Sequence, residues 1–155
     1  MQINNIKCAV LLLAGAALVA FLFWLFFQPV EIVAVHHRSN NYSAILVKNF
    51  PLTDKGKINW WLNNRAMIKE KYNIPYPDKK GFFSVVVWPF GEGYKKDMQD
   101  DNQYCFDDMK SDKNCIEKNA IFIIGSSRGN QAYFSVDNGE YILKNNGDII
   151  KTKSE

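Results

Sequence analysis

The stretch CAVLLLAGAALVAFLFWLFF, residues 8–27, is 20 residues long and carries no charge. A helix of this length spans about 30 Å, the thickness of the hydrocarbon core of a bilayer. A secretory signal peptide has a shorter apolar region, which ends at small residues in a more polar context. Here the small residues Ala14-Gly15-Ala16 are followed by eleven more apolar residues. We therefore predict a retained transmembrane helix over residues 8–27, with a cleaved signal or a buried soluble helix as the alternatives.

The same segment argues against a lipoprotein leader. In such a leader the cysteine to be acylated follows the small residues directly, whereas Cys8 precedes them and Ala16 stands in its place. Two small residues four positions apart, Ala16 and Ala20, have a spacing that lets two helices pack closely in lipid. The segment therefore allows a homodimer through the anchor, and alanines that merely face lipid are the alternative.

Charges at the two ends of the segment set its orientation. Lys7 and the amino terminus flank one end, whereas Arg38 is the first positive charge after the other. The positive-inside rule then places residues 1–7 in the cytoplasm and residues 30–155 on the opposite side of the membrane. The counts are small, and long domains cross regardless of charge.

After the anchor, residues 30–35 and 42–47 have the composition of two β-strands, and the turn residues between them predict a hairpin. Thr53 or Asp54 can cap a helix. Apolar residues at helical spacing over 58–72 predict one amphipathic helix of about 15 residues, which ends before Pro75. Trp60 and Trp61 lie on it, so we expect one to enter the core and the other to cover it or to be exposed.

The rest of the chain favours an antiparallel sheet. Residues 82–88 are β-branched and aromatic and indicate a central strand, whereas the polar stretch 91–119 has the least regular pattern. Four further strands are predicted over 120–125, 132–136, 141–143 and 148–151, joined by turns at Arg128-Gly129-Asn130, Asp137-Asn138-Gly139 and Asn145-Asn146-Gly147. The prediction is one α+β domain over residues 30–155, with an antiparallel β-meander and one amphipathic helix.

Catalytic and metal-binding patterns are missing from the sequence. It contains neither G-x-S-x-G nor H-E-x-x-H, and His36 and His37 are its only histidines. Adjacent residues on a strand point to opposite faces, so these two cannot easily share a metal, and we interpret them as a surface pair next to the membrane. The net charge of +3 is not gathered into a basic block, which disfavours nucleic acid as a partner. We expect no enzyme activity, no catalytic residue and no cofactor.

Cys105 and Cys115 flank the loop CFDDMKSDKNC. In an oxidising compartment they are a natural disulfide pair, and closing a loop of this size contributes about 2–3 kcal/mol by the loop-entropy argument. Two free thiols or a metal pair are the alternatives. The spacing is too long for a C-x-x-C zinc knuckle.

The same region carries an excess of acidic residues. Six aspartates stand against Lys110 between positions 97 and 112: Asp97, Asp100, Asp101, Asp107, Asp108 and Asp112. We interpret them as a candidate surface for a basic protein partner. A solvated face and a calcium site are the alternatives, and the spacing lacks the alternating ligands of an EF-hand loop.

Four segments together resemble a known family: QPVEIVAVHH (28–37), LVKNFPLTDKGKINWWL (46–62), CFDDMK (105–110) and NCIEK (114–118). They resemble the uncharacterised enterobacterial proteins called domain of unknown function 943. The likeness covers nearly the whole chain. It implies a short envelope protein with a single anchor, and it supplies no catalytic residues.

The expected protein is therefore a single-pass protein of the bacterial inner membrane with its C-terminal domain in the periplasm. We expect a binding protein for a protein partner, such as an immunity protein against a toxin that acts in the periplasm. A structural or regulatory accessory subunit of an envelope complex is the alternative.

Overall fold

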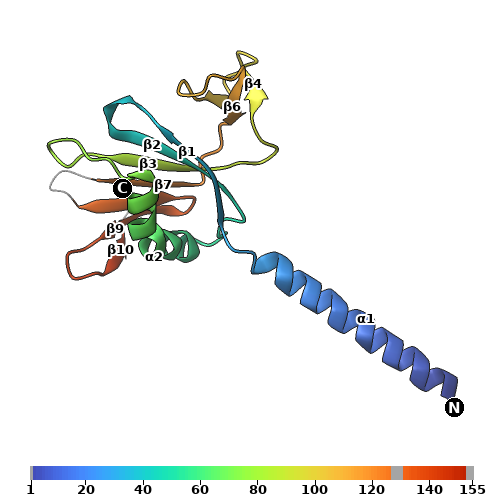
Figure 1. The fold of residues 1–155 in the computed structure, drawn as a ribbon. Helices are drawn as coiled ribbons and strands as arrows, with labels where there is room; N and C mark the ends of the chain where they lie inside the picture. The colour runs from blue at the N-terminus through green and yellow to red at the C-terminus, as the bar shows by residue number, and fades with distance from the viewer. Residues whose placement is uncertain (1, 127–130, 153–155) are drawn as a thin grey trace.

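The computed structural model describes residues 2–126 and 131–152 as an extended helix followed by a folded domain (Figure 1). The elements are α1 (Gln2–Phe26), β1 (Glu31–His37), a 3-10 turn (Ser39–Asn41), β2 (Tyr42–Lys48), α2 (Asp54–Tyr72), β3 (Ser84–Pro89), β4 (Lys95–Lys96), β5 (Gln103–Cys105), β6 (Lys113–Glu117), β7 (Phe122–Ser126), β8 (Ala132–Val136), β9 (Gly139–Leu143) and β10 (Ile149–Lys151). The α+β class predicted from the sequence is confirmed.

Helix α1 projects from the domain as a separate rod (Figure 1). Its segment Ile6–Leu25 is long and apolar enough to cross a membrane, judged by length and composition, and none of it is buried against the domain. An apolar rod of this kind is costly in water but stable in lipid, where its backbone hydrogen bonds are all internal.

The main sheet has seven strands in the order β1-β2-β3-β7-β8-β9-β10. The predicted hairpin is confirmed, because β1 and β2 pair antiparallel. The predicted C-terminal meander is confirmed as well, because β7 to β10 pair antiparallel in sequence order. The predicted turn at Arg128-Gly129-Asn130 lies outside the described residues. One feature was not predicted: β2 and β3 are parallel, with α2 as the crossover that parallel strands need.

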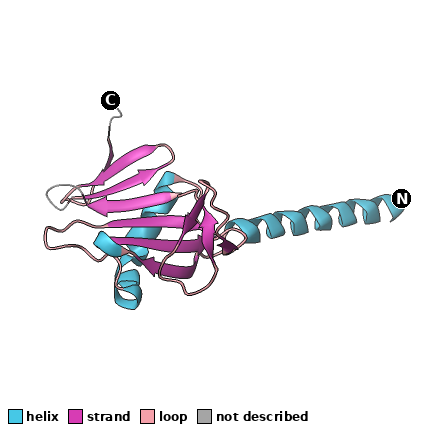
Figure 2. Ribbon diagram, turned by 90° about the horizontal axis from the view of Figure 1, so that it is seen from above, coloured by secondary structure: helices cyan, strands magenta, loops and turns pink. Residues whose placement is uncertain are grey.

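Helix α2 covers one face of the main sheet (Figure 2). Thr53 caps its first turn by accepting a hydrogen bond from the Gly56 N–H. The helix has 19 residues, somewhat more than predicted. Trp61 is buried in the core, whereas Trp60 is partly buried and packs edge-on against Phe50, so the prediction of one core and one covering tryptophan is confirmed.

The opposite face of the main sheet carries a second sheet, of order β4-β6-β5, which we call the small sheet (residues 94–119). Phe106 and Ile116 of the small sheet pack against Leu46 and Trp88 of the main sheet. The stretch with the least regular pattern, residues 91–119, thus contains three short strands that were not predicted. These strands are short and bury only one side, so they lack the apolar run by which a strand is recognised.

Candidate functional site

One edge of the main sheet lies next to the anchor. Glu31, at the start of β1, pairs with Lys48, at the end of β2, and Val47 pairs with Pro89 at the end of β3. The Asn49 amide also donates a hydrogen bond of 3.5 Å to the Pro29 carbonyl in the linker after α1. We call this region the anchor-side edge: residues 48–53, 89–93, 120–121 and 137–138.

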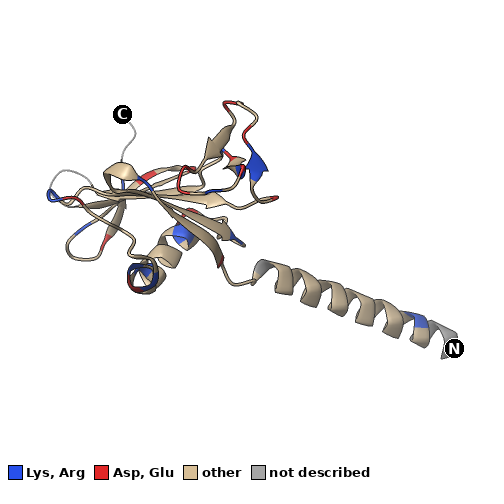
Figure 3. Cartoon of the chain, turned by 45° about the horizontal axis from the view of Figure 1, so that its top comes forward, with Lys and Arg blue, Asp and Glu red and all other residues tan. Residues whose placement is uncertain are grey.

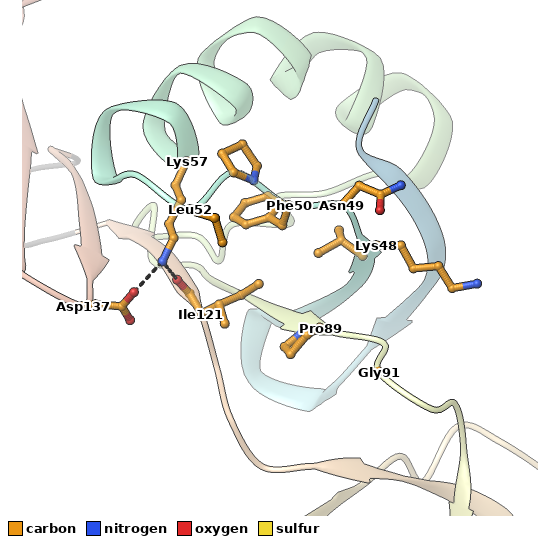
Figure 4. A pocket seen from close by; sticks show the side chains of 11 residues that line it. Lys48, Asn49, Phe50, Leu52, Lys57, Pro89, Gly91, Ile121 and Asp137 are labelled. Atoms are coloured by element: carbon orange, nitrogen blue, oxygen red, sulfur yellow. Dashed lines mark hydrogen bonds and ion pairs between the residues drawn. The ribbon is translucent and has the colours of Figure 1, made fainter. Parts of the chain in front are cut away.

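A pocket of about 490 Å³ opens on the anchor-side edge (Figure 4). Its size falls within the usual range for small-molecule sites. Most of its wall is apolar, and it is lined by Val47, Lys48, Asn49, Phe50, Pro51, Leu52, Lys57, Pro89, Gly91, Ile121 and Asp137. It lies at the carboxyl ends of the parallel strands β2 and β3, a common position for ligand sites in sheets with parallel strands.

Lys57 provides the main polar group of the pocket. It lies in the first turn of α2, and its side chain is only 4% exposed. Its ammonium donates to the Ile121 carbonyl at 2.9 Å and to Oδ2 of Asp137 at 2.7 Å (Figure 4). The Asp137 side chain is 67% exposed. A buried cation is costly unless it is paired and hydrogen-bonded, and these two acceptors meet that requirement.

The outer parts of the pocket differ in character. Leu52 is 83% exposed, more than any other large apolar side chain that the structure describes outside α1. Lys48 points away from Lys57 (Figure 4), with its ammonium 5.5 Å from the centroid of the Phe90 ring. The pocket therefore has an exposed apolar residue, Leu52, at its rim, and a cation, Lys48, that points away from the buried ion pair.

The polar chemistry of this pocket centres on the Lys57–Asp137 ion pair. The ionisable groups in its lining are Lys48, Lys57 and Asp137, and the last two pair with each other. A ligand that fits must combine apolar and polar groups, because apolar walls surround the Lys57–Asp137 ion pair.

Sequence reasoning did not identify the pocket. One signal was present: Lys57 precedes Trp61 by four positions and Ile68 by eleven, and all three lie on the buried stripe of α2. A lysine at such a position needs a partner. The sequence could not show that Asp137, 80 residues later, supplies it.

The six predicted aspartates all lie on the small sheet and its loops, and all are exposed: Asp97, Asp100, Asp101, Asp107, Asp108 and Asp112. They do not form a uniform acidic cluster. Asp97 and Asp100 each accept a hydrogen bond from a backbone N–H two residues later, and Asp112 pairs with Lys96 at 2.8 Å. Asp101 and Asp107 make no hydrogen bond or ion pair within the described residues.

Asp108 binds His36, and this contact overturns the predicted surface pair of histidines. His37 is exposed, but His36 is 5% exposed and its ring stacks on Phe106 with centroids 3.9 Å apart. The Nδ1 atom of His36 donates to the Asp108 carboxylate at 2.8 Å, because an ionised carboxylate only accepts. The Nε2 atom lies 2.7 Å from the Tyr94 hydroxyl.

The position of His36 was also wrongly predicted. Strand β1 runs away from the anchor, so His36 lies about 17 Å along the strand from Glu31 rather than next to the membrane. The contacts of its ring join the small sheet to β1. Burial raises the pKa of Tyr94, and the nearby Asp108 charge raises it further.

Cys105 and Cys115 form the predicted disulfide and face each other on the neighbouring strands β5 and β6. Cys8 is free and exposed on α1. The carboxylate of Asp97 lies near the two bridged sulfurs, but a disulfide offers no thiolate to bind a metal.

Helix α1 has a shallow groove that is lined by small and aromatic residues: Gly15, Ala16, Val19, Ala20, Phe23 and Trp24. Ala16 and Ala20, on which the predicted helix pairing depends, share this face. The homodimer stays a prediction.

The chain was compared with protein-family models, curated proteins and solved structures. The family model described as "Enterobacterial putative membrane protein (DUF943)" matches residues 2–153. The comparisons with curated proteins and with solved structures found no match.

Proposed function

The chain belongs to the DUF943 family, and from this premise we propose that it is a single-pass inner-membrane protein that presents a non-catalytic binding domain to a protein partner in the periplasm. The apolar helix α1 supports a membrane anchor. The disulfide between Cys105 and Cys115 supports an oxidising compartment, since such bonds are rare in the cytosol.

The observation that carries the proposed binding role is the charge of the small sheet (Figure 3). Residues 94–119 contain seven acidic and five basic residues, whereas the whole chain has a net charge of +3. A negatively charged unit is thus displayed on a chain that is otherwise positive. Charge of this kind speeds association with a basic partner and disfavours wrong partners.

Asp101 and Asp107 are the residues that a partner would contact first, because both are exposed and neither is engaged within the described chain. Asp108 contributes less to such a surface, since its carboxylate already binds His36. The disulfide holds strands β5 and β6 together, so the loops that carry these aspartates keep a defined shape before binding.

A photo-crosslinking residue at position 101 of the full-length protein in cells tests this role. We expect a protein adduct at position 101 and none at Glu70, which is exposed on α2 on the other side of the main sheet. In the protein labelled at position 101, charge reversal with D107K should abolish the adduct, whereas E70K should not. An identical adduct pattern at positions 101 and 70, or none at 101, would contradict the proposal.

Two kinds of partner fit this surface. One is a toxin delivered to the periplasm, which makes the protein an immunity protein. The other is a resident envelope complex, which makes it an accessory subunit. Deletion should sensitise cells to a neighbour's toxin in the first case only, whereas the second predicts crosslinks to resident membrane proteins without any toxin present.

A further inference from the structure

The short linker after the anchor limits how far the domain can stand from the bilayer. Only residues 27–30 separate α1 from β1. Fully extended, the chain from Phe26 to Glu31 spans at most about 18 Å. The headgroup layer adds about 5–8 Å to each side of the hydrocarbon core. The anchor-side edge, where β1 begins, must therefore lie close to the lipid headgroups.

The side chain composition of this edge suits that position. Leu52 is 83% exposed and stands in the connection from β2 to α2, four residues after the Lys48–Glu31 pair that marks the edge. A leucine that is fully exposed to water gains none of the free energy of burial. Contact with the headgroup–acyl boundary recovers part of it.

Lys48 supplies charge complementarity next to Leu52. It is exposed, has no ion pair within the described residues, and points away from Lys57 (Figure 4). Its ammonium lies 5.5 Å from the centroid of the Phe90 ring. A lysine near an anionic membrane surface is attracted to it and strengthens binding. Its cross-strand neighbour Glu31 forms no ion pair with it within the described residues, so the lysine charge is available to lipid phosphates.

We propose that the anchor-side edge is seated in the lipid headgroup layer, with Leu52 inserted at the headgroup–acyl boundary and Lys48 in contact with lipid phosphates. The pocket beside them then opens onto lipid. Its apolar walls and its Lys57–Asp137 pair match a glycerophospholipid, which combines an apolar part with a charged headgroup. This surface is separate from the small sheet and does not depend on the proposed protein partner.

The test uses the full-length protein with Cys8→Ser in lipid nanodiscs, with a nitroxide spin label at Leu52→Cys. The matched control is Tyr76→Cys, another exposed large side chain, which lies near the β1–β2 turn at the far end of the domain. Collision with oxygen, which concentrates in lipid, is compared with collision with a water-soluble nickel chelate. We expect the oxygen-to-nickel ratio to be several-fold higher at position 52 than at position 76.

Equal ratios at the two positions would overturn the proposal. If the label at position 52 is shielded from the nickel chelate in native membranes but not in nanodiscs of pure lipid, the edge contacts a protein partner. That result would also overturn the proposal. A failure of crosslinking at Asp101, in contrast, would leave this result unchanged.

The role of Lys48 is tested by adding Lys48→Glu to the labelled protein. In nanodiscs containing phosphatidylglycerol, we expect this change to lower the ratio at position 52 severalfold. Lys71→Glu is the matched control, because Lys71 lies at the C-terminal end of α2, which begins at the anchor-side edge and is about 28 Å long. Equal effects of the two substitutions on the ratio at position 52 would overturn the phosphate contact. Soluble glycerol phosphate at millimolar concentration should not change the ratio in either variant.

Discussion

His36 and His37 show what a local pattern can predict about single residues. That adjacent residues on a strand face opposite ways follows from backbone geometry, and the structure agrees. Which of the two is buried depends on Phe106 and Asp108, about 70 residues later, folding over β1. Nothing in the sequence near position 36 carries that information.

Replacing His36 with alanine should destabilise the domain. The variant loses the stacking on Phe106 and the hydrogen bonds to Asp108 and Tyr94. We expect a loss of about 2–3 kcal/mol in the free energy of unfolding, because one of these bonds is to a charged group. Urea unfolding of the detergent-solubilised protein measures it. His37→Ala is the control and should change the value by less than about 0.5 kcal/mol; equal effects would show that the buried contacts of His36 contribute no stability.

The Lys57–Asp137 ion pair predicts which of two substitutions destabilises the domain more. Asp137→Ala leaves the buried Lys57 ammonium with the Ile121 carbonyl as its one remaining acceptor among the described residues. We expect the free energy of unfolding to fall by about 1–3 kcal/mol. Lys57→Met removes the charge and keeps an apolar chain of similar length, so it should cost less, since apolar replacements of buried ion pairs are often neutral. Thermal unfolding of both variants tests the order. A larger loss for Lys57→Met would mean that the ion pair stabilises the fold beyond the cost of burying it.

Tyr94 predicts a pH dependence of stability. Burial, followed by the Asp108 charge, raises its pKa above the ordinary value of 10.0. The folded state thus holds the phenol proton more tightly than the unfolded state. The resulting stability is fully present below the unfolded pKa of about 10 and is lost as the pH rises through the folded pKa.

Unfolding midpoints measured on both sides of pH 10 test this dependence. The decline above pH 10 should be smaller in Tyr94→Phe than in the unchanged protein. Tyr76→Phe, on the exposed surface, serves as the control. The same decline in all three proteins would exclude Tyr94 as its source.

Among the elements, those with an unambiguous periodicity were predictable. The long apolar run predicted α1, the spacing from Ile58 predicted α2, and the Asn-Gly turns predicted the C-terminal meander. The parallel pairing of β2 with β3 was not predictable, because a strand's composition does not identify its neighbour. The small sheet was missed because β4 and β5 have only two and three residues.

The disulfide should stabilise the small sheet more than the rest of the domain. It closes a loop of ten residues between β5 and β6, which corresponds to about 2–3 kcal/mol in the loop-entropy model. In a C105S/C115S double variant, hydrogen exchange should become faster in β4, β5 and β6. The central strands β2, β3 and β7 should keep their protection, because α2 covers them from the other face. Uniform acceleration across both sheets would show that they unfold as one unit.

At the scale of the whole molecule, the anchor determines how the two surfaces are used. The small sheet and the anchor-side edge belong to different parts of the domain, since the small sheet packs on a face of the main sheet and the pocket opens at its end. One molecule can therefore contact lipid at its edge and still present Asp101 and Asp107. This arrangement requires only that α1 stays in the membrane and that residues 30–155 lie on its outer side.

That orientation can be tested directly. Alkaline phosphatase, which folds only where disulfides form, should be active when it is fused after Glu155. A green fluorescent protein fused at the same position should not fluoresce, because it would be exported with the domain. Alkylation of intact cells before reduction gives an independent reading, because it should modify Cys8 at most and leave Cys105 and Cys115 bridged. A fluorescent fusion together with alkylated Cys105 and Cys115 would place the domain in the cytosol. It would then remove the support for a periplasmic partner, because a reducing compartment does not maintain the bond that joins β5 to β6.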